Sequence, residues 1–217
     1  MIRAFIFDLD GVVVDTARYH YAAWKELAAD LGFHFTEEEN EKLKGVSRMR
    51  SLDILLEAGG LRFPEAEKLK MAERKNTRYV ELISGMTPDE VLPGVLNFLV
   101  TTRNLNIRTA LGSASRNAPL ILEKTGLASW FDVVVDGNSV SEAKPDPEVF
   151  LKAASLLGVY PGDSIVFEDA VAGIEAADNA GMRSVGVGDA VVLKKAGYVI
   201  PGFSGLTASL ILDILNK

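Results

Sequence analysis

The segment Ala4-Phe5-Ile6-Phe7-Asp8-Leu9-Asp10-Gly11 passes from an apolar run to two carboxylates and a glycine. A short run of apolar and aromatic residues that stops at a turn is typical of a buried β-strand. If the strand continues through Asp10, the side chains of Asp8 and Asp10 point to the same side, and Gly11 lets the backbone turn away directly afterwards. We expect this strand end to be exposed at the surface, and it is the first candidate for a functional site.

Short apolar strands of the same kind return in the second half of the chain. Strands are expected at 107–111, 131–135, 164–167 and 184–187, and helical spacing is found at 95–103, 120–125, 147–157 and 170–180. Strands that alternate with helices in this way predict an α/β fold, with a Rossmann-like parallel sheet core and helices on both faces.

Between the first strand and its expected partners lies a segment with helical spacing only. Helices are expected from Thr16, a candidate N-cap, to a stop at Gly32, and over 47–58 and 65–83. We therefore expect a helical-bundle cap of residues 16–87, inserted into an α/β catalytic core of residues 1–15 and 88–217.

The composition excludes several classes of protein. With 217 residues, 48% hydrophobic and 24% charged, the chain has the balance of a folded globular protein. A net charge of −7 argues against a nucleic-acid binder, and no stretch approaches the roughly 18 apolar residues of a membrane span. The absence of cysteine excludes a thiolate nucleophile and Cys-ligated zinc, and it fits the reducing cytoplasm, where we expect the protein to be located.

Polar side chains follow the predicted strands, with Lys144 just after one of them; the set is Asp8, Asp10, Ser113, Ser115, Lys144, Glu168 and Asp169. Because ligands bind at the carboxyl ends of the strands in open α/β sheets, we expect these side chains to converge on one edge. Carboxylates this close need a cation between them, and a set of oxygen ligands favours Mg2+. Together with a lysine, hydroxyl groups and backbone N–H donors, the set predicts phosphoryl transfer with a carboxylate nucleophile.

Four motifs carry a resemblance to a known family. They are Asp8-Leu9-Asp10-Gly11-Val12, Gly112-Ser113-Ala114-Ser115, Lys144-Pro145 and Glu168-Asp169-Ala170-Val171-Ala172-Gly173. One such motif alone is a weak signal, but four in order over essentially the whole chain are specific. On these motifs the chain resembles the haloacid dehalogenase superfamily of phosphotransferases.

The resemblance implies a role for each residue of the core. Asp8 would be the nucleophile, which forms an aspartyl-phosphate, and Asp10 would be the general acid/base. Mg2+ would be held by Asp8, the backbone carbonyl of Asp10 and Asp169, with Glu168 beside them. The residues implied to bind the transferring phosphoryl group are Ser113, Ala114 and Lys144.

The expected cap resembles a branch of the family that interconverts β-D-glucose 1-phosphate and β-D-glucose 6-phosphate through a glucose 1,6-bisphosphate intermediate. This resemblance rests on Asp15-Thr16 with His20 and Trp24, on Lys44-Gly45-Val46-Ser47-Arg48, and on Arg74-Lys75-Asn76. It implies that Arg48 holds the phosphate that is not transferred. The implied substrate-binding residues are Thr16, His20, Trp24, Lys44, Gly45, Arg48, Ser51, Lys75, Ser115, Arg116 and Asn117.

Other interpretations of single residues stay open. His20 and Trp24 lie on the apolar face of a predicted helix, where both side chains could simply pack in the interior. Lys75 has charged neighbours and could belong to a solvated helix face. Ser113 could cap the helix that follows it.

Two other functions are compatible with the same core. A phosphatase of sugar phosphates or nucleotides would use the same chemistry at Asp8, with water as the acceptor. A non-catalytic phosphosugar sensor would keep the binding residues without turnover. We expect a monomer that takes a small-molecule sugar phosphate, uses Mg2+, and binds neither nucleic acid nor a membrane.

Overall fold

A computed structural model describes residues 1–215, and the last two residues of the expected core lie outside this range. Its six strands form one parallel sheet in the order β3-β2-β1-β4-β5-β6. The chain starts in the middle of the sheet, builds outward to one side, and then returns to build the other side beside β1, so β1 and β4 meet at the switch point. The strands are β1 Ala4–Phe7, β2 Arg108–Gly112, β3 Val133–Val135, β4 Ser164–Glu168, β5 Arg183–Val187 and β6 Tyr198–Ile200.

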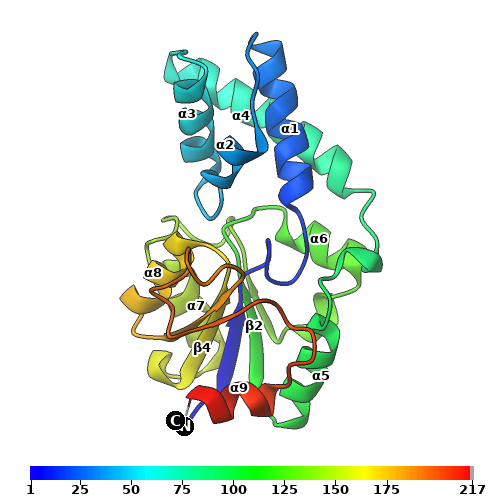
Figure 1. The fold of residues 1–217 in the computed structure, drawn as a ribbon, viewed down its shortest axis with the longest axis vertical. Coiled ribbons are helices and arrows are strands. Elements are labelled where there is room, and N and C mark those ends of the chain that lie inside the picture. The colour runs from blue at the N-terminus through cyan, green and yellow to red at the C-terminus, as the bar shows by residue number, and fades with distance from the viewer. Residues whose placement is uncertain (216–217) are drawn as a thin grey trace.

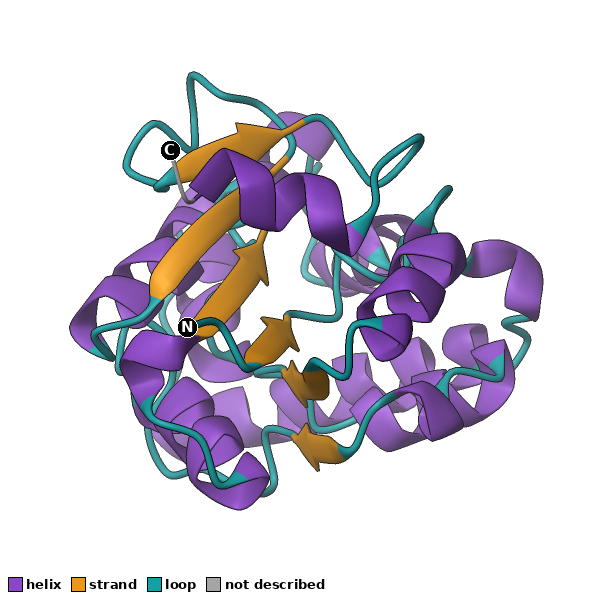
Figure 2. Cartoon of the chain, turned by 90° about the horizontal axis from the view of Figure 1, so that it is seen from below, coloured by secondary structure: helices purple, strands orange, loops and turns teal. Residues whose placement is uncertain are grey.

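Alternate residues of β1 explain why both faces of the sheet are covered. Phe5 and Phe7 lie on one face, where Phe7 stacks on Phe167 with ring centres 4.8 Å apart. Ala4 and Ile6 lie on the other face, in a second apolar cluster. Figure 2 shows helices on both sides of the strands, as predicted. The first face is covered by α5 Val95–Asn104, α6 Ala118–Thr125 and α9 Ala208–Leu215, and the second by α7 Glu148–Leu157 and α8 Val171–Asn179.

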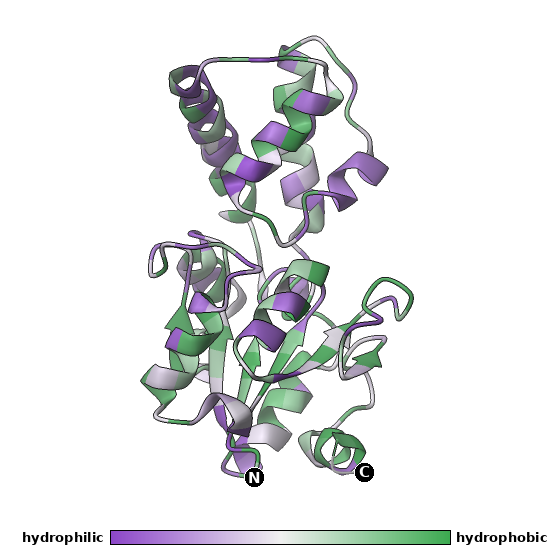
Figure 3. Cartoon of the chain, turned by 90° about the vertical axis from the view of Figure 1, so that its left-hand side faces the viewer, coloured by the Kyte–Doolittle hydropathy of each residue, from purple (hydrophilic) through white to green (hydrophobic). Residues whose placement is uncertain are grey.

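Four α-helices lie between β1 and α5 in the chain, and Figure 1 shows them beyond the carboxyl ends of the strands. They surround an apolar cluster of their own, which includes Trp24 and Leu52. Their outer surfaces are largely hydrophilic, while the strands of the sheet are mostly hydrophobic (Figure 3). The helices are α1 Ala17–Asp30, α2 Glu37–Glu41, α3 Arg48–Ala58 and α4 Glu65–Ile83.

The chain joins this helical segment to the sheet twice, before α1 and after α4. At the joint, Glu90 accepts hydrogen bonds from the guanidinium of Arg18 and, at 2.8 Å, from the Tyr19 hydroxyl. Tyr79 and Ile83 of α4 pack into the apolar cluster of the sheet. No helix within residues 1–215 combines the length and the apolar character that a membrane crossing needs.

The sequence prediction missed several elements. These are β6, α2, α9 and the 3₁₀ helices η1 Pro88–Glu90, η2 Ala128–Trp130 and η3 Pro161–Asp163. Helix α2 has only five residues and begins with a capping box, in which the Thr36 and Glu39 side chains each bond the other's backbone N–H. Thr16 precedes α1 as expected, but its side chain does not cap that helix.

Candidate active site

Three carboxylates meet where the central strands β1 and β4 end. Because Phe7 is paired with Phe167, Asp8 lies level with Glu168, and one oxygen from each of Asp8, Glu168 and Asp169 lies within 4.8 Å of the others. Asp8 is only 6% exposed, so the expectation of a surface-exposed strand end was wrong. A central strand has neighbours on both sides, and the loops after those strands cover its end.

Two glycines make room for these carboxylates. A side chain at Gly11, which has a φ of 77°, would place its Cβ 2.2 Å from Oδ2 of Asp169. A Cβ at Gly173 would lie 2.0 Å from the carboxyl carbon of Glu168. Both glycines therefore serve close approach, and any larger residue would displace a carboxylate.

The amino group of Lys144 is enclosed between two of the carboxylates. It donates to Oδ1 of Asp8 at 2.5 Å and to Oε2 of Glu168 at 2.8 Å. Burial disfavours the ammonium, but the charges of Asp8 and Glu168 outweigh it and raise the pKa of Lys144. We expected Lys144 to follow a strand directly, and this was wrong. β3 ends at Val135, and Lys144 lies in the long loop before α7.

The positive charge of Lys144 does not balance the negative charges of Asp8, Glu168 and Asp169. Burial, followed by the charges of Glu168 and Asp8, raises the pKa of Asp169 to about 9. A crowded set of oxygen ligands with excess negative charge fits a hard divalent cation such as Mg2+.

Asp10 lies in the turn after β1, not on an extended strand. Its backbone N–H donates to Oδ2 of Asp8 at 2.9 Å, and its carboxylate accepts a hydrogen bond from the Thr16 hydroxyl. This bond explains why Thr16 does not cap α1. Burial and the charge of Asp8 raise the pKa of Asp10 to about 6. A carboxyl group with that pKa can give and take a proton near neutral pH.

The segment after β2 presents backbone donors. The Ser113 hydroxyl accepts from the N–H of Ser115 at 3.1 Å, and the Ser115 hydroxyl accepts from the N–H of Asn117 at 3.2 Å. In the described part of the chain, the N–H groups of Ala114 and Arg116 have no acceptor. Ser113 does not cap the next helix, because α6 begins only at Ala118.

On the cap side, Lys75 of α4 is buried against aromatic rings. Its Nζ lies 2.9 Å from Nδ1 of His20, 4.4 Å from the ring centre of Trp24 and 4.7 Å from that of Tyr79. Burial and then the charge of Arg48 lower the pKa of Lys75 to about 7. Burial and the charge of Lys75 hold the pKa of His20 well below its usual value.

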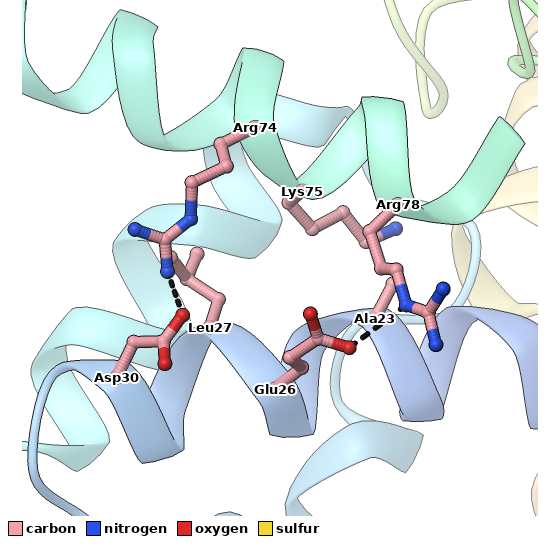
Figure 4. Close-up of a pocket in the computed structure, with 7 residues that line it drawn as sticks. All are labelled: Ala23, Glu26, Leu27, Asp30, Arg74, Lys75 and Arg78. Carbon is pink, nitrogen blue, oxygen red and sulfur yellow. Dashed lines mark hydrogen bonds and ion pairs between the residues drawn. The ribbon is translucent and has the colours of Figure 1, made fainter. Parts of the chain in front are cut away.

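Figure 4 shows how Lys75 lies relative to Arg74 and Arg78, its charged neighbours on α4. These neighbours were the reason to consider that Lys75 belongs to a solvated helix face. The side chains of Arg74 and Arg78 reach to Asp30 and Glu26 of α1, and both ion pairs are at the surface. Lys75 lies between the two arginines but is only 4% exposed. The groove here encloses about 20 Å³, so it is an ordinary contact between helices.

Two arginines, Arg48 of the cap and Arg116 of the segment after β2, are close enough for their charges to interact. Arg48 begins α3, and burial followed by the charge of Arg116 lowers its pKa. Within residues 1–215, neither guanidinium forms an ion pair. Beside them, the Asn117 amide donates to Oδ1 of Asn76 at 2.9 Å. Asn76 belongs to the Arg74-Lys75-Asn76 motif, but a pattern along one chain gives no sign of this contact.

The other expected cap residues divide into two groups. Lys44 and Gly45 lie close to the core: the charge of Lys44 lowers the pKa of Asp169, and a Cβ on Gly45 would lie 2.6 Å from that of Ala170. Trp24 and Ser51 are buried within the cap, and Trp24 belongs to its apolar cluster. In the described part of the chain, Ser51 forms no hydrogen bond with the carboxylates of the cluster.

Comparison with known proteins identifies relatives along the whole chain. A β-phosphoglucomutase of Bacillus subtilis is 44% identical over 97% of this chain and 94% of its own. The crystal structure of a β-phosphoglucomutase from Clostridium difficile superposes with a TM-score of 0.94, at 46% identity, over 100% of this chain and 98% of that one. A phosphorylated carbohydrates phosphatase of Thermotoga maritima is 33% identical over 91% of this chain and 93% of its own.

The family model described as haloacid dehalogenase-like hydrolase matches residues 2–181, which include all four motifs and every carboxylate described above. On this match and these relatives, the chain belongs to the haloacid dehalogenase-like hydrolase family.

Proposed function

We propose that this protein is a β-phosphoglucomutase, which interconverts β-D-glucose 1-phosphate and β-D-glucose 6-phosphate through an aspartyl-phosphate enzyme and a glucose 1,6-bisphosphate intermediate. Near full-length relatives of that name, at 44% and 46% identity, support the proposal. The phosphatase relative is more distant, at 33% identity.

The core residues supply the chemistry. Phosphorylated Asp8 transfers its phosphoryl group to the free hydroxyl of the sugar monophosphate, which gives the bisphosphate. After the sugar has turned over, Asp8 attacks the other phosphate, the bond from that phosphate to the sugar oxygen breaks, and the product monophosphate leaves while the aspartyl-phosphate is restored. Asp10, with a pKa raised to about 6 by burial and by the charge of Asp8, protonates the departing sugar oxygen and deprotonates the incoming one. Lys144 keeps its charge beside Asp8, and together with Ser113 and the free N–H of Ala114 it holds the phosphoryl oxygens.

Mg2+ is the proposed cofactor. Asp8, the Asp10 carbonyl and Asp169 would hold it, with Glu168 beside them, as the crowded oxygen ligands suggest. When bound, the ion supplies positive charge to the phosphoryl oxygens and lessens the repulsion between phosphate and carboxylate. The ion also accounts for an excess of carboxylates that Lys144 alone does not balance.

One observation favours a mutase over a plain phosphatase: the charge of Arg116 acts on Arg48, and within residues 1–215 neither arginine forms an ion pair with a carboxylate. A bisphosphate must be held by its second phosphate while the first reacts. One guanidinium group from the cap and one from the core suit that phosphate, because arginine binds phosphate with two parallel hydrogen bonds.

The remaining cap residues are assigned to the sugar and its second phosphate. From the core, Ser115 and Asn117 are assigned to them. From the cap, the assigned residues are Thr16, His20, Trp24, Lys44, Gly45, Ser51 and Lys75. We also keep as predictions the division into a core of residues 1–15 and 88–217 and a cap of residues 16–87, the monomeric state and the cytoplasmic location.

The test is to measure glucose 6-phosphate formation and free phosphate release in one reaction. The enzyme is given β-D-glucose 1-phosphate and Mg2+, with and without a trace of glucose 1,6-bisphosphate. A mutase forms glucose 6-phosphate faster than it releases phosphate, and the bisphosphate accelerates it. Phosphate release without glucose 6-phosphate would identify a phosphatase. If neither product forms, the phosphosugar sensor becomes the favoured function.

A further inference from the structure

A turn after β3 contains a buried carboxylate that the proposed reaction does not use. Asp136 is 7% exposed and accepts three hydrogen bonds. The donors are the backbone N–H of Asn138 at 3.1 Å, its side-chain amide at 2.8 Å and the Ser139 hydroxyl at 2.8 Å. Asp136 thereby fixes the orientation of the Asn138 amide, although Asn138 itself is exposed.

The turn around Asp136 is bonded to the segment that follows β2. The side-chain amide of Asn138 also donates to the carbonyl of Arg116 at 3.0 Å, and the N–H of Gly137 donates to the carbonyl of Ser115 at 3.2 Å. The approach is close, since a Cβ on Gly137 would lie 2.2 Å from the carbonyl oxygen of Ala114. Two successive carbonyls of the β2 segment are therefore turned toward this loop.

Because a peptide group is planar and trans, fixing a carbonyl fixes the N–H on the other side of the same peptide bond. The Ser115 carbonyl fixes the N–H of Arg116, which has no acceptor among the described residues. In the same way, the Arg116 carbonyl fixes the N–H of Asn117. The side-chain amide of Asn117 donates to Asn76 of the cap. Arg116 and Asn117 are the core residues assigned above to the second phosphate.

We infer that Asn138, held by Asp136, is a positioning residue for the site of the non-transferring phosphate. It touches neither the sugar nor the reacting atoms; it sets the peptide planes from which Arg116 and Asn117 reach that phosphate. The inference rests on the proposed function, and it assigns Asn138 to the second phosphate, not to the chemistry at Asp8.

The test compares two substrates in the variant Asn138→Ala. Acetyl phosphate has no second phosphate, and β-D-glucose 1-phosphate primed with glucose 1,6-bisphosphate needs that site. We expect kcat/KM for the primed sugar phosphate to fall about three- to tenfold, mainly through KM, because one positioning hydrogen bond is lost. We expect acetyl phosphate hydrolysis to stay unchanged. Asn138 is exposed, so the variant keeps the packing of the wild type.

Ser139→Ala is the matched control, because it also removes one hydrogen bond from Asp136 but none from Arg116. It should leave both substrates at wild-type values. An equal loss on both substrates in Asn138→Ala, or no loss on either, overturns the inference. Failure of the wild type to form glucose 6-phosphate would instead reject the proposed function, and the inference with it.

Discussion

Lys144 at the sheet and Lys75 in the cap are buried to the same degree, with 5% and 4% of their surface exposed, but their pKa values move in opposite directions. Burial opposes the charge of both. Lys144 touches the carboxylates of Asp8 and Glu168, which raise its pKa. Lys75 touches an imidazole and two aromatic rings, and burial with the charge of Arg48 lowers its pKa to about 7.

The difference shows how the charges on each side of the site are paired before a substrate binds. At the sheet, Lys144 is already paired with the carboxylates of Asp8 and Glu168. With Asp169 the net charge there is negative, which suits a metal ion. On the cap side, Arg48 and Lys75 form no ion pair with a carboxylate among the described residues, and this local positive charge suits phosphate. Changes at the sheet should therefore affect every substrate, whereas changes in the cap should affect those that carry a second phosphate.

The largest expected effect comes from removing the nucleophile. Asp8→Asn should lower glucose 6-phosphate formation and acetyl phosphate hydrolysis together by at least ~10³-fold, because an amide neither attacks phosphorus nor binds a metal ion well. Lys144 keeps Glu168 as a partner, so the fold should survive. Rates of both reactions and a circular dichroism spectrum check this. More than a few per cent of residual activity would mean that another residue is the nucleophile.

Asp10→Asn should lower turnover by ~10²–10⁴-fold, the usual contribution of a general acid/base. Binding should change little, because the backbone carbonyl assigned to the metal ion stays in place. Single-turnover rates and the Mg2+ titration separate the two effects. Wild-type rates when the chemical step limits turnover would remove Asp10 from the mechanism.

Asp169→Ala should raise the Mg2+ concentration needed for half-maximal activity at least about tenfold, as expected when a metal ligand is lost. The measurement is a Mg2+ titration of acetyl phosphate hydrolysis. The control is Asp163→Ala, which removes a carboxylate at the end of η3, just before β4. A titration curve like that of the wild type would show that Asp169 is not a ligand. Excess chelator should abolish activity in all three proteins.

Arg48→Ala tests the cap side of the comparison. It removes a charge-assisted contact of ~1.5–3 kcal/mol to the second phosphate, so the mutase rate should fall at least about tenfold. Acetyl phosphate hydrolysis should persist, and the ratio of glucose 6-phosphate formed to phosphate released should drop. Arg50→Ala, an exposed arginine on the same helix, is the control. An unchanged ratio would favour a phosphatase.

Lys75→Met should change the pH dependence of stability. Between the pKa of about 7 that Lys75 has in the fold and its ordinary value of 10.5, the unfolded chain binds the extra proton. Stability of the wild type should therefore rise with pH in this window, by up to ~1.4 kcal/mol per pH unit from this group. Urea unfolding at several pH values should show Lys75→Met as the more stable protein near pH 7, with the gap closing as pH rises. Lys70→Met, an exposed lysine of the same helix, should show no such gap.

The sheet and its site could be predicted because their signals are local. Each long helix showed a regular spacing, and each buried strand was marked by a short apolar run. Asp8 and Ser113 directly follow such strands and Glu168 is the last residue of one, and these strand ends must meet at one edge. Short elements such as α2 and β6 carry too few residues for a period to show. Lys144 was identified by its motif, although it belongs to a long loop.

Contacts between distant segments could not be predicted in the same way. The burial of Lys75 depends on α1 packing against α4, and the bond from Asn138 to Arg116 depends on two loops meeting beyond the sheet. Tyr79 illustrates the same limit: its spacing marks it as an apolar helix position, but only the fold places its ring against His20, at 4.0 Å between ring centres.

The joint at Glu90 has a consequence for how such a protein diversifies. The helical segment leaves and rejoins the sheet at neighbouring points, so a gene could exchange this whole segment for another without moving any strand. The carboxylates that perform the chemistry would be inherited unchanged, and the newly acquired segment would bring its own preference for a substrate. A lineage could thus acquire new substrates by recombination at two adjacent positions, while the reaction itself is passed on.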